Sequence, residues 1–305
     1  MNEVVLTGLD ASNPLAFMAA LGVLNVLADR TSGGDEPRLS FRNEGVWRPV
    51  VRGADSMGSL VDIALRDLRT WDGDLALGLS YAKSSGTLVS DLKPKPAVFR
   101  AYLRGLLDRA TPRSVAHAAA FATDVAEDNN GNTKPTALHF TAGQQVFLEM
   151  VKTLVRQVTA DDIHEALVGP WRYGRELPVL GWDGTASRAY ALRARDPSTE
   201  KKLGVPGADW LAFRGLSFFR VVPRGRRIQT TCVSGEWKTG LLRWPLWTVP
   251  VERATVQTVL ALPHGELAGR TETERRARGI GAIFESSIER SDQGGYGSFG
   301  PSRAG

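Results

Sequence analysis

A buried helix is predicted by the stretch Asn13-Pro-Leu-Ala-Phe-Met-Ala-Ala-Leu-Gly-Val-Leu-Asn-Val-Leu-Ala-Asp29. Asn13 is a preferred N-cap residue, and Pro14 suits the first helical position, where its missing N–H costs nothing. The residues that follow are apolar all round the helix axis, which is typical of a core helix rather than a surface one. The uncharged run from Leu15 to Leu27 is shorter than the ~20 residues that span a bilayer, so we expect an intracellular protein without a membrane segment.

Outside this helix, the spacing of apolar residues indicates an α+β protein. Further helices are predicted over 56–69, 97–109, 141–158, from 159 to the Gly169-Pro170 pair, and over 253–261, with strands near 4–6, 39–41, 46–51, 217–222, 228–233 and 241–247. Residues 124–135 are predicted to be a polar loop. We expect a helix-rich part over 1–170 and a basic, mostly antiparallel, strand-rich part over 171–305. A single interleaved domain is the alternative.

Composition excludes several classes of protein. Hydrophobic residues make up 42% and charged residues 23% of the 305 residues, which is ordinary for a globular protein. Cys232 is the only cysteine, so neither an intrachain disulfide nor a thiolate cluster for zinc or iron–sulfur can form. Lys and Arg number 38 against 33 Asp and Glu, and the excess lies entirely in residues 201–305, which carry 16 basic and 9 acidic residues.

The common catalytic motifs are missing from the sequence. It contains neither a phosphate-binding Gly-x-x-x-x-Gly-Lys-Ser/Thr loop nor a Gly-x-Ser-x-Gly nucleophile elbow. A Gly-x-Gly-x-x-Gly match at 295–300 is followed by only five residues, too few for the helix that a dinucleotide site needs. A calcium-like loop at 126–131 lacks its first and last carboxylates and is read as a solvated turn. We therefore expect no catalytic residue, no metal and no cofactor.

Four segments carry the cations that phosphate binding requires. They are the Lys93-Pro-Lys95-Pro loop with Arg100; a basic turn with Arg220, Arg224, Arg226 and Arg227; a cluster with Arg270, Arg275, Arg276 and Arg278; and Trp171-Arg172-Tyr-Gly-Arg175, where aromatics alternate with arginines. The aromatic tail 294–299 could stack on a base, dock on a partner or be a frayed terminus. The tryptophans at 182, 210, 244 and 247 are predicted to be core residues because each lies in an apolar run. His139, beside Phe140 in an expected strand, is predicted to be a core or edge histidine, and Cys232 a small core hydrophobe.

Several phrases, in this order, resemble CRISPR effector subunits of the type I-G (formerly I-U) systems. The phrases are Leu6-Thr-Gly-Leu-Asp-Ala-Ser-Asn-Pro14 with the helix after it, Gly181-Trp-Asp183 leading to Ser187-Arg-Ala-Tyr-Ala-Leu192, Gly207-Ala-Asp-Trp-Leu-Ala-Phe-Arg-Gly-Leu216, Arg243-Trp-Pro-Leu-Trp247 and Gln293-Gly-Gly-Tyr-Gly297. They are spread over most of the chain.

The resemblance implies a non-catalytic, large-subunit-like member of an RNA-guided surveillance complex. Such a subunit contacts guide RNA and target DNA near the protospacer-flanking motif, binds other effector-complex protein subunits and helps recruit a separate helicase–nuclease, with no membrane partner. Base pairing to the guide then supplies the sequence specificity. Arg188 joins the candidate nucleic-acid-binding residues through this resemblance. At 305 residues the chain is short for a large subunit, so an accessory role stays open.

Two other functions remain open on the sequence. One is a metal-dependent nuclease or other hydrolase that uses dispersed carboxylates such as Asp183, Asp209 and Glu236. The other is an assembly protein that only bridges subunits and touches no nucleic acid.

Overall fold

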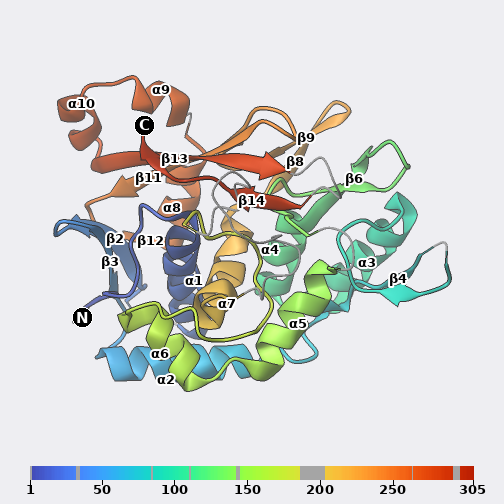
Figure 1. Cartoon of the computed structure of the whole chain (residues 1–305), viewed down its shortest axis with the longest axis horizontal. Helices are drawn as coiled ribbons and strands as arrows, with labels where there is room; N and C mark the ends of the chain where they lie inside the picture. The colour runs from blue at the N-terminus through green and yellow to red at the C-terminus, as the bar shows by residue number, and fades with distance from the viewer. Residues whose placement is uncertain are drawn as a thin grey trace, which may run out of the picture.

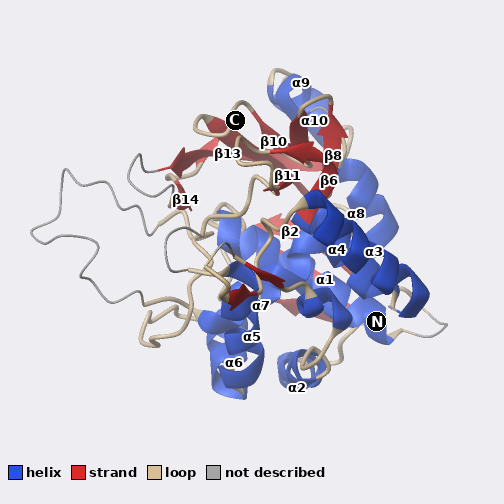
Figure 2. Ribbon diagram, turned by 90° about the vertical axis from the view of Figure 1, so that its right-hand side faces the viewer, coloured by secondary structure: helices blue, strands red, loops and turns tan. Residues whose placement is uncertain are grey.

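We examined a computed structural model of the chain (Figure 1). It describes residues 2–31, 35–83, 85–109, 111–141, 145–185, 203–262, 264–290 and 296–305. The fold is α+β, as the sequence predicts. Most of the described helices come from the first two thirds of the chain, and the C-terminal part forms an antiparallel sheet. Figure 2 shows this sheet on one side of the helical layer. None of the described helices is long and apolar enough to cross a membrane.

The described α-helices are α1 (Pro14–Arg30), α2 (Met57–Arg69), α3 (Pro96–Arg109), α4 (Pro112–Phe121), α5 (Phe147–Gln157), α6 (Ala160–Val168), α7 (Pro206–Gly215), α8 (Arg253–Leu260), α9 (His264–Ala268) and α10 (Glu272–Arg276), with short 3-10 turns η1 (Leu75–Gly78) and η3 (Leu216–Phe218). They include a central pair, α1 and α7, whereas α9 and α10 lie against the C-terminal sheet (Figure 1).

The described strands form two larger sheets and three hairpins. The first sheet has the order β1 (Glu3–Val5), β3 (Trp47–Arg52), β2 (Arg38–Asn43), β12 (Val251–Glu252). In the second, β10 (Val233–Ser234), β11 (Gly240–Trp247), β13 (Ile280–Arg290) and β14 (Gly297–Phe299) lie in that order, and β15 (Arg303–Ala304) also pairs with β13. The hairpins are β4 (Tyr81–Ala82) with β5 (Leu88–Val89), β6 (Ala122–Glu127) with β7 (Thr133–Pro135), and β8 (Val221–Arg224) with β9 (Arg227–Thr230).

Helix α1 is the centre of the core, as its sequence predicts. The Asn13 side chain accepts a hydrogen bond from the Leu15 amide at 2.9 Å and so caps the helix. Residues 14–27 of α1 are all buried. Helix α7 lies against α1 (Figure 1), and the two backbones approach so closely at Gly22 and Gly215 that a Cβ on either glycine would overlap the other helix.

The C-terminal part of the chain completes structures that the N-terminal part begins. Strand β12 pairs with β2 at Leu39. From β11, the Trp244 indole donates to the Ala11 carbonyl at 2.9 Å and the Trp247 indole to the Leu39 carbonyl at 2.7 Å. One continuous cluster of buried apolar residues therefore extends across both sides of residue 170.

Several local predictions differ from the structure. Residues 124–135 are not a plain polar loop, because the hairpin β6–β7 occupies most of them. Helix α5 begins at Phe147 after an N-cap at Val146 without a side-chain hydrogen bond, so the capping box expected at Thr141 does not start it. Helix α7 and strand β13 were not predicted at all. The capping box of Thr159 and Asp162 is confirmed at the start of α6.

Candidate nucleic-acid interface

The predicted basic turn is the tip of the β8–β9 hairpin. Gly225 lies in the turn with a φ of 61°, a left-handed backbone conformation that glycine adopts without steric cost. Arg224 and Arg227 are register partners at the ends of the two strands, and Arg226 lies between them. All three arginines are exposed. The hairpin thus projects three guanidinium groups from one short turn.

The β6–β7 hairpin brings a second predicted basic segment to the same surface. Lys134 on β7 donates to the Arg226 carbonyl at 2.8 Å, which joins the two hairpins. The Lys95 ammonium, in the Lys-Pro loop before α3, donates to the carbonyl oxygens of Asn130 at 2.6 Å and Gly131 at 3.3 Å in the β6–β7 turn. Figure 1 shows β6, β8 and β9 together at one end of the molecule. Segments 130 residues apart in sequence therefore form one surface.

The Lys95 ammonium lies where the calcium-like loop would hold a cation. The Asp128 side chain accepts from the amides of Asn130 and Asn132 at 2.8 and 2.9 Å, and the loop carbonyls face the Lys95 ammonium. Such contacts are typical of a polar turn, which is how the sequence was read.

An exposed tryptophan that the sequence analysis did not single out lies beside this surface. Trp237 is 44% exposed, and the Arg290 guanidinium stacks 3.6 Å from its ring centroid. Arg290 is itself held by the carbonyl oxygens of Trp237, His139 and Ala137, at 3.0, 2.9 and 2.7 Å. Burial lowers the pKa of Arg290 to about 10, so it is still a cation at neutral pH. The stack fixes the indole in place, as a base-stacking platform requires.

The sequence did contain a signal for Trp237. It stands between two charged residues, Glu236 and Lys238, whereas Trp182, Trp210 and Trp244 each have a single charged neighbour and Trp247 has none. Those four are buried, as predicted. A tryptophan flanked by charged residues is a better candidate for an exposed aromatic face than one in an apolar run.

Acidic side chains offset part of the positive charge on this surface. Arg227 pairs with Glu236 at 2.6 Å in a largely exposed pair, and Arg100 pairs with the half-buried Asp124 at 2.8 Å. Exposed pairs contribute little energy, so a phosphate can compete for these guanidinium groups. Burial lowers the pKa of Lys93, although the nearby Asp91 carboxylate opposes that shift. Arg220, next to β8, is exposed.

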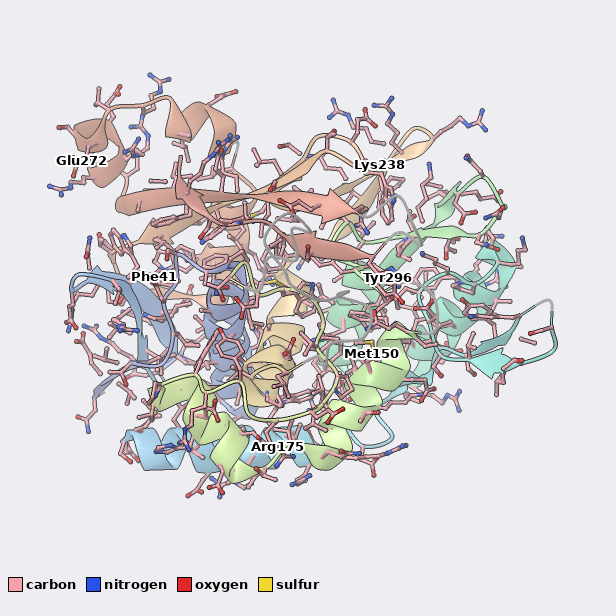
Figure 3. The ribbon with its side chains drawn as sticks, in the orientation of Figure 1. Phe41, Met150, Arg175, Lys238, Glu272 and Tyr296 are labelled. Atoms are coloured by element: carbon pink, nitrogen blue, oxygen red, sulfur yellow. The ribbon has the colours of Figure 1, made fainter. Side chains whose placement is uncertain are left out.

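The other predicted basic residues lie elsewhere. Arg175 is 3.7 Å from Asp162 at the start of α6, and its label in Figure 3 is far from that of Lys238. The exposed Arg172 is on the same side, where its amide donates to the Glu165 carboxylate at 2.6 Å. Arg188 falls outside the described residues.

The third basic cluster surrounds α10, at the opposite end of β13 from Arg290 (Figure 1). The guanidinium of Arg275 turns back onto the carbonyl oxygens of Ala268 and Arg270, at 3.3 and 2.8 Å. Arg276 pairs with Glu272 at 2.6 Å. The described residues therefore place the predicted cations on three surfaces. We call the surface formed by the β6–β7 and β8–β9 hairpins and the Lys93–Lys95 loop the β6–β9 surface; among the described residues, only this one brings together two of the predicted basic segments, the Lys-Pro loop and the basic turn.

Of the three carboxylates of the alternative nuclease hypothesis, only Asp183 and Asp209 lie near each other. Asp183 accepts hydrogen bonds from Asn13 at 2.7 Å and Tyr173 at 2.8 Å, while Asp209 accepts from the Leu180 amide at 3.0 Å. Burial raises the pKa of Asp209 to about 8, and the nearby charge of Asp183 adds to that rise. Glu236 lies in the exposed pair with Arg227. Within the described part of the chain, no three His, Cys, Asp or Glu side chains are grouped as a metal site requires.

The remaining residues of interest are mostly structural. His139 is 1% exposed, as predicted, and its Nε2 lies 3.1 Å from Asp91. The thiol of Cys232 donates to the Leu260 carbonyl at 3.4 Å, and its pKa is raised by burial. The C-terminal tail is not frayed: β14 pairs with the end of β13 and buries Phe299. No known protein family, curated protein or solved structure matches this chain.

Proposed function

We propose that this protein is a non-catalytic, nucleic-acid-binding subunit of a type I-G CRISPR surveillance complex, acting in the cytoplasm. In this role it contacts guide RNA, target DNA or both near the protospacer-flanking motif, beside other protein subunits. It helps to present the opened target to a separate helicase–nuclease. The sequence resemblance supplies the setting, and the β6–β9 surface supports the binding role.

One observation carries the proposal: the basic β8–β9 hairpin, the Lys93–Lys95 loop and a fixed, exposed indole occupy one surface. Cations along a backbone path with an aromatic face for stacking are the combination that binds single-stranded nucleic acid. Arg224, Arg226 and Arg227 would neutralise phosphates, and Trp237 would stack on a base. Such contacts read shape and charge, and leave sequence recognition to the guide.

The test is binding of a labelled single-stranded oligonucleotide at several salt concentrations. Each phosphate contact contributes about one unit to the slope of log affinity against log salt, or slightly less on single strands. We expect the triple variant Arg224→Ala, Arg226→Ala, Arg227→Ala to reduce that slope by about two to three units. The matched control neutralises three arginines near α10, namely Arg270, Arg276 and Arg278, and should leave the slope nearly unchanged. Equal effects of the two triple variants would refute the assignment of this surface.

A second variant separates stacking from charge. Trp237→Leu removes the aromatic face but no cation, so it should weaken single-strand binding about tenfold and leave the salt slope intact. Trp182→Leu is not a suitable control, because Trp182 is buried and its indole donates to the Leu138 carbonyl at 2.9 Å. Arg290→Lys is the better variant to compare with Trp237→Leu, since it keeps a cation at this position but removes the planar guanidinium that stacks on Trp237.

The complex itself provides the wider test. Affinity purification from the native host should recover the chain with a small RNA carrying repeat-derived sequence and with further effector subunits. Cleavage of a labelled duplex by the isolated chain, dependent on a divalent metal and abolished by Asp183→Ala, would instead favour the hydrolase alternative. A complex without crosslinks between this chain and nucleic acid would leave only the bridging role.

A further inference from the structure

The C-terminal tail places an exposed tyrosine near the Arg290–Trp237 stack. Tyr296 is 37% exposed (Figure 3), whereas Phe299 is buried and packs edge-on against Phe140, with 4.9 Å between the ring centroids. Phe299 anchors β14 in the core, and Tyr296 comes directly before this strand. The tail therefore has one aromatic residue that holds it in place and one that stays at the surface.

Gly297 connects this tyrosine to the Arg290 guanidinium. It is the register partner of Arg290, and its amide donates to the Phe140 carbonyl at 3.1 Å. A Cβ on Gly297 would lie 3.1 Å from Arg290 Nη1 and only 2.4 Å from the Phe140 ring. A glycine is therefore what lets the tail lie so close to the guanidinium. Tyr296 is the next residue, so its backbone starts beside Arg290.

The same guanidinium carries the Trp237 ring. Its central carbon lies 3.6 Å from the ring centroid of Trp237 and 5.3 Å from that of Phe140. The three carbonyl oxygens that bind it hold it in one position. Two exposed aromatic residues from distant parts of the chain are thus positioned by one arginine. We call Trp237, Arg290 and Tyr296 the aromatic platform.

The positive charge of the platform lacks a carboxylate partner among the described residues. The hydrogen bonds that Arg290 makes to them all go to carbonyl oxygens. Lys93 lies close enough to feel this charge. Burial is the main cause of the lowered pKa of Lys93, nearby carboxylates oppose the shift, and the charge of Arg290 adds to it. Two cations therefore lie close together, one in the platform and one in the Lys-Pro loop.

The acidic side chains in this region have other partners or another orientation. Asp91 and Asp128, the carboxylates near Lys93, accept hydrogen bonds from backbone amides. Glu236 pairs with Arg227 at 2.6 Å. Glu289 is next to residue 290 in β13, and consecutive residues of a strand point to opposite faces of the sheet. These carboxylates offset the charges of Lys93 and Arg227, whereas Arg290 keeps its charge.

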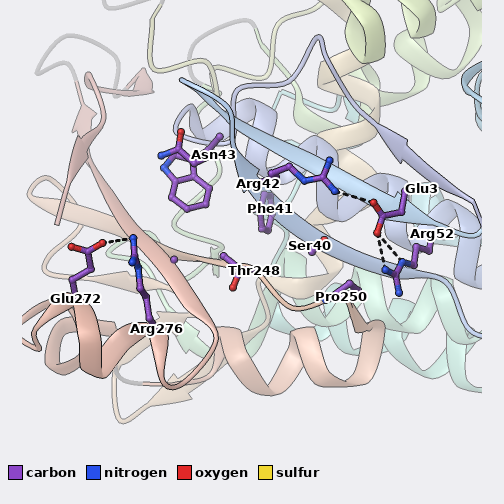
Figure 4. Close-up of a pocket in the computed structure, with 12 residues that line it drawn as sticks. Glu3, Ser40, Phe41, Arg42, Asn43, Arg52, Thr248, Pro250, Glu272 and Arg276 are labelled. Atoms are coloured by element: carbon purple, nitrogen blue, oxygen red, sulfur yellow. Dashed lines mark hydrogen bonds and ion pairs between the residues drawn. The ribbon is translucent and has the colours of Figure 1, made fainter.

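A cavity elsewhere in the molecule shows the opposite arrangement. It has a volume of about 700 Å³ and lies between β2 and α10 (Figure 4). Its arginines all pair with glutamates: Arg42 and Arg52 with Glu3 at 2.9 and 2.7 Å, and Arg276 with Glu272 at 2.6 Å. The cations of that cavity are already neutralised, so the aromatic platform is the better place for an anionic ligand.

We propose that Trp237 and Tyr296 stack on two unpaired bases of the same strand, whose phosphates the charge of Arg290 attracts. Base–aromatic stacking needs an open base face, so the platform selects single strands over a duplex, in which the bases are already stacked. Exposed aromatic residues also suit a proline-rich peptide, but such a peptide carries no phosphate for Arg290. The inference rests on the proposed function and extends its single stacking contact to two.

The first experiment measures the fluorescence anisotropy of a fluorescein-labelled thymidine oligomer of twelve nucleotides. Tyr296→Leu should weaken binding about tenfold, and the double variant Trp237→Leu, Tyr296→Leu about a hundredfold. The salt slope should stay that of the wild type, because neither change removes a cation. Tyr296→Phe is the matched control: it keeps the ring and should bind within about twofold of the wild type. Circular dichroism checks that each variant is folded.

The second experiment removes the bases instead of the rings. An oligomer of twelve abasic deoxyribose phosphates keeps the charges of the first probe. The wild type should bind it about a hundredfold more weakly than the thymidine oligomer, because both stacking contacts are lost. Tyr296→Leu should bind the abasic oligomer as well as the wild type does, since no base is left for the ring.

The outcomes separate this inference from the proposed function. If Tyr296→Leu binds the thymidine oligomer normally while Trp237→Leu binds it weakly, the second stacking contact is wrong and the proposed function stands. Equal losses in Tyr296→Phe and Tyr296→Leu would also overturn the contact, because the ring would then not be what binds. Displacement of the oligomer by a ten-residue polyproline peptide from the wild type but not from Tyr296→Leu would assign Tyr296 to a protein partner instead. A wild type that does not bind the oligomer at all would refute the nucleic-acid role itself.

Discussion

Replacing Gly22 by alanine probes the contact on which the whole core depends. A Cβ at this position would lie 1.7 Å from the Leu211 carbonyl oxygen and 2.7 Å from its carbonyl carbon. Both are backbone atoms in the middle of α7, so no side-chain rotation can relieve the overlap. Gly215 is in the reciprocal position, since a Cβ added there would lie 2.1 Å from the Met18 carbonyl oxygen. The two helices cross where each has a glycine.

The expected loss follows from the distance that the helices must move. An ordinary carbon–oxygen contact is about 3.3–3.6 Å, so α1 and α7 must separate by roughly 1.5–2 Å. A gap of even 0.5–1 Å forfeits about a quarter to a half of the dispersion energy of the lining atoms. Alanine recovers about 1 kcal/mol through its higher helix propensity. We expect Gly22→Ala to lower the free energy of unfolding by about 3 kcal/mol, at the upper end of typical overpacking costs.

Urea denaturation followed by far-UV circular dichroism measures this loss, and Gly105→Ala is the matched control. Gly105 lies within α3, where the nearest atom to a new Cβ is the end of the Arg109 side chain at 3.9 Å. The control should therefore gain about 0.5–1 kcal/mol from helix propensity alone. If Gly22→Ala is within about 1 kcal/mol of the wild type, the two helices do not meet in this way.

Three further predictions concern buried polar groups and a helix cap. Arg214→Leu should cost about 3 kcal/mol in urea denaturation, because it removes the buried guanidinium that lies 2.8 Å from Asp67 and 2.7 Å from Asp29; Asp29 keeps its pair with Arg253, but Asp67 keeps only Arg113 at 3.9 Å, and a loss below about 1 kcal/mol would contradict this. Burial raises the pKa of Asp209 to about 8, so the folded chain keeps a proton that the unfolded chain releases above about pH 4. The stability of the wild type relative to Asp209→Asn should then fall by about 1.4 kcal/mol per pH unit between those values, and parallel pH profiles would exclude a raised pKa. Thr159→Ala removes the hydroxyl half of the α6 capping box, while Asp162 still accepts from the backbone N–H of residue 159, and it should cost about 1 kcal/mol; an unchanged unfolding midpoint would mean that the hydroxyl contributes nothing.

The elements predicted correctly are those whose signals are local. Asn13 and Pro14 mark the start of α1, and the apolar residues that follow it predict complete burial, which the structure confirms. The basic turn at Gly225 is confirmed because a glycine between two apolar runs is a local hairpin signal. The capping box at Thr159 is confirmed for the same reason.

The elements missed are those that depend on distant partners. Strand β13 mixes glycine, serine and charged residues in Ile280–Arg290, and it becomes a strand because β11 pairs along its length. Helix α7 contains two glycines and has Val205 at its N-cap, which makes no side-chain hydrogen bond, so its local helix signal is weak although Pro206 suits the first position. It forms where α1 offers a matching glycine.

The sequence by itself determined the α+β class, the buried central helix and the location of the basic segments, because composition, periodicity and capping act over a few residues. Only the tertiary structure decided which cations share a surface, since Lys95, Lys134 and Arg226 meet through hydrogen bonds between distant hairpins. It also decided that Trp237 stacks on Arg290. Contacts between residues far apart in the chain leave no pattern in either segment alone, because each segment carries only half of the interaction.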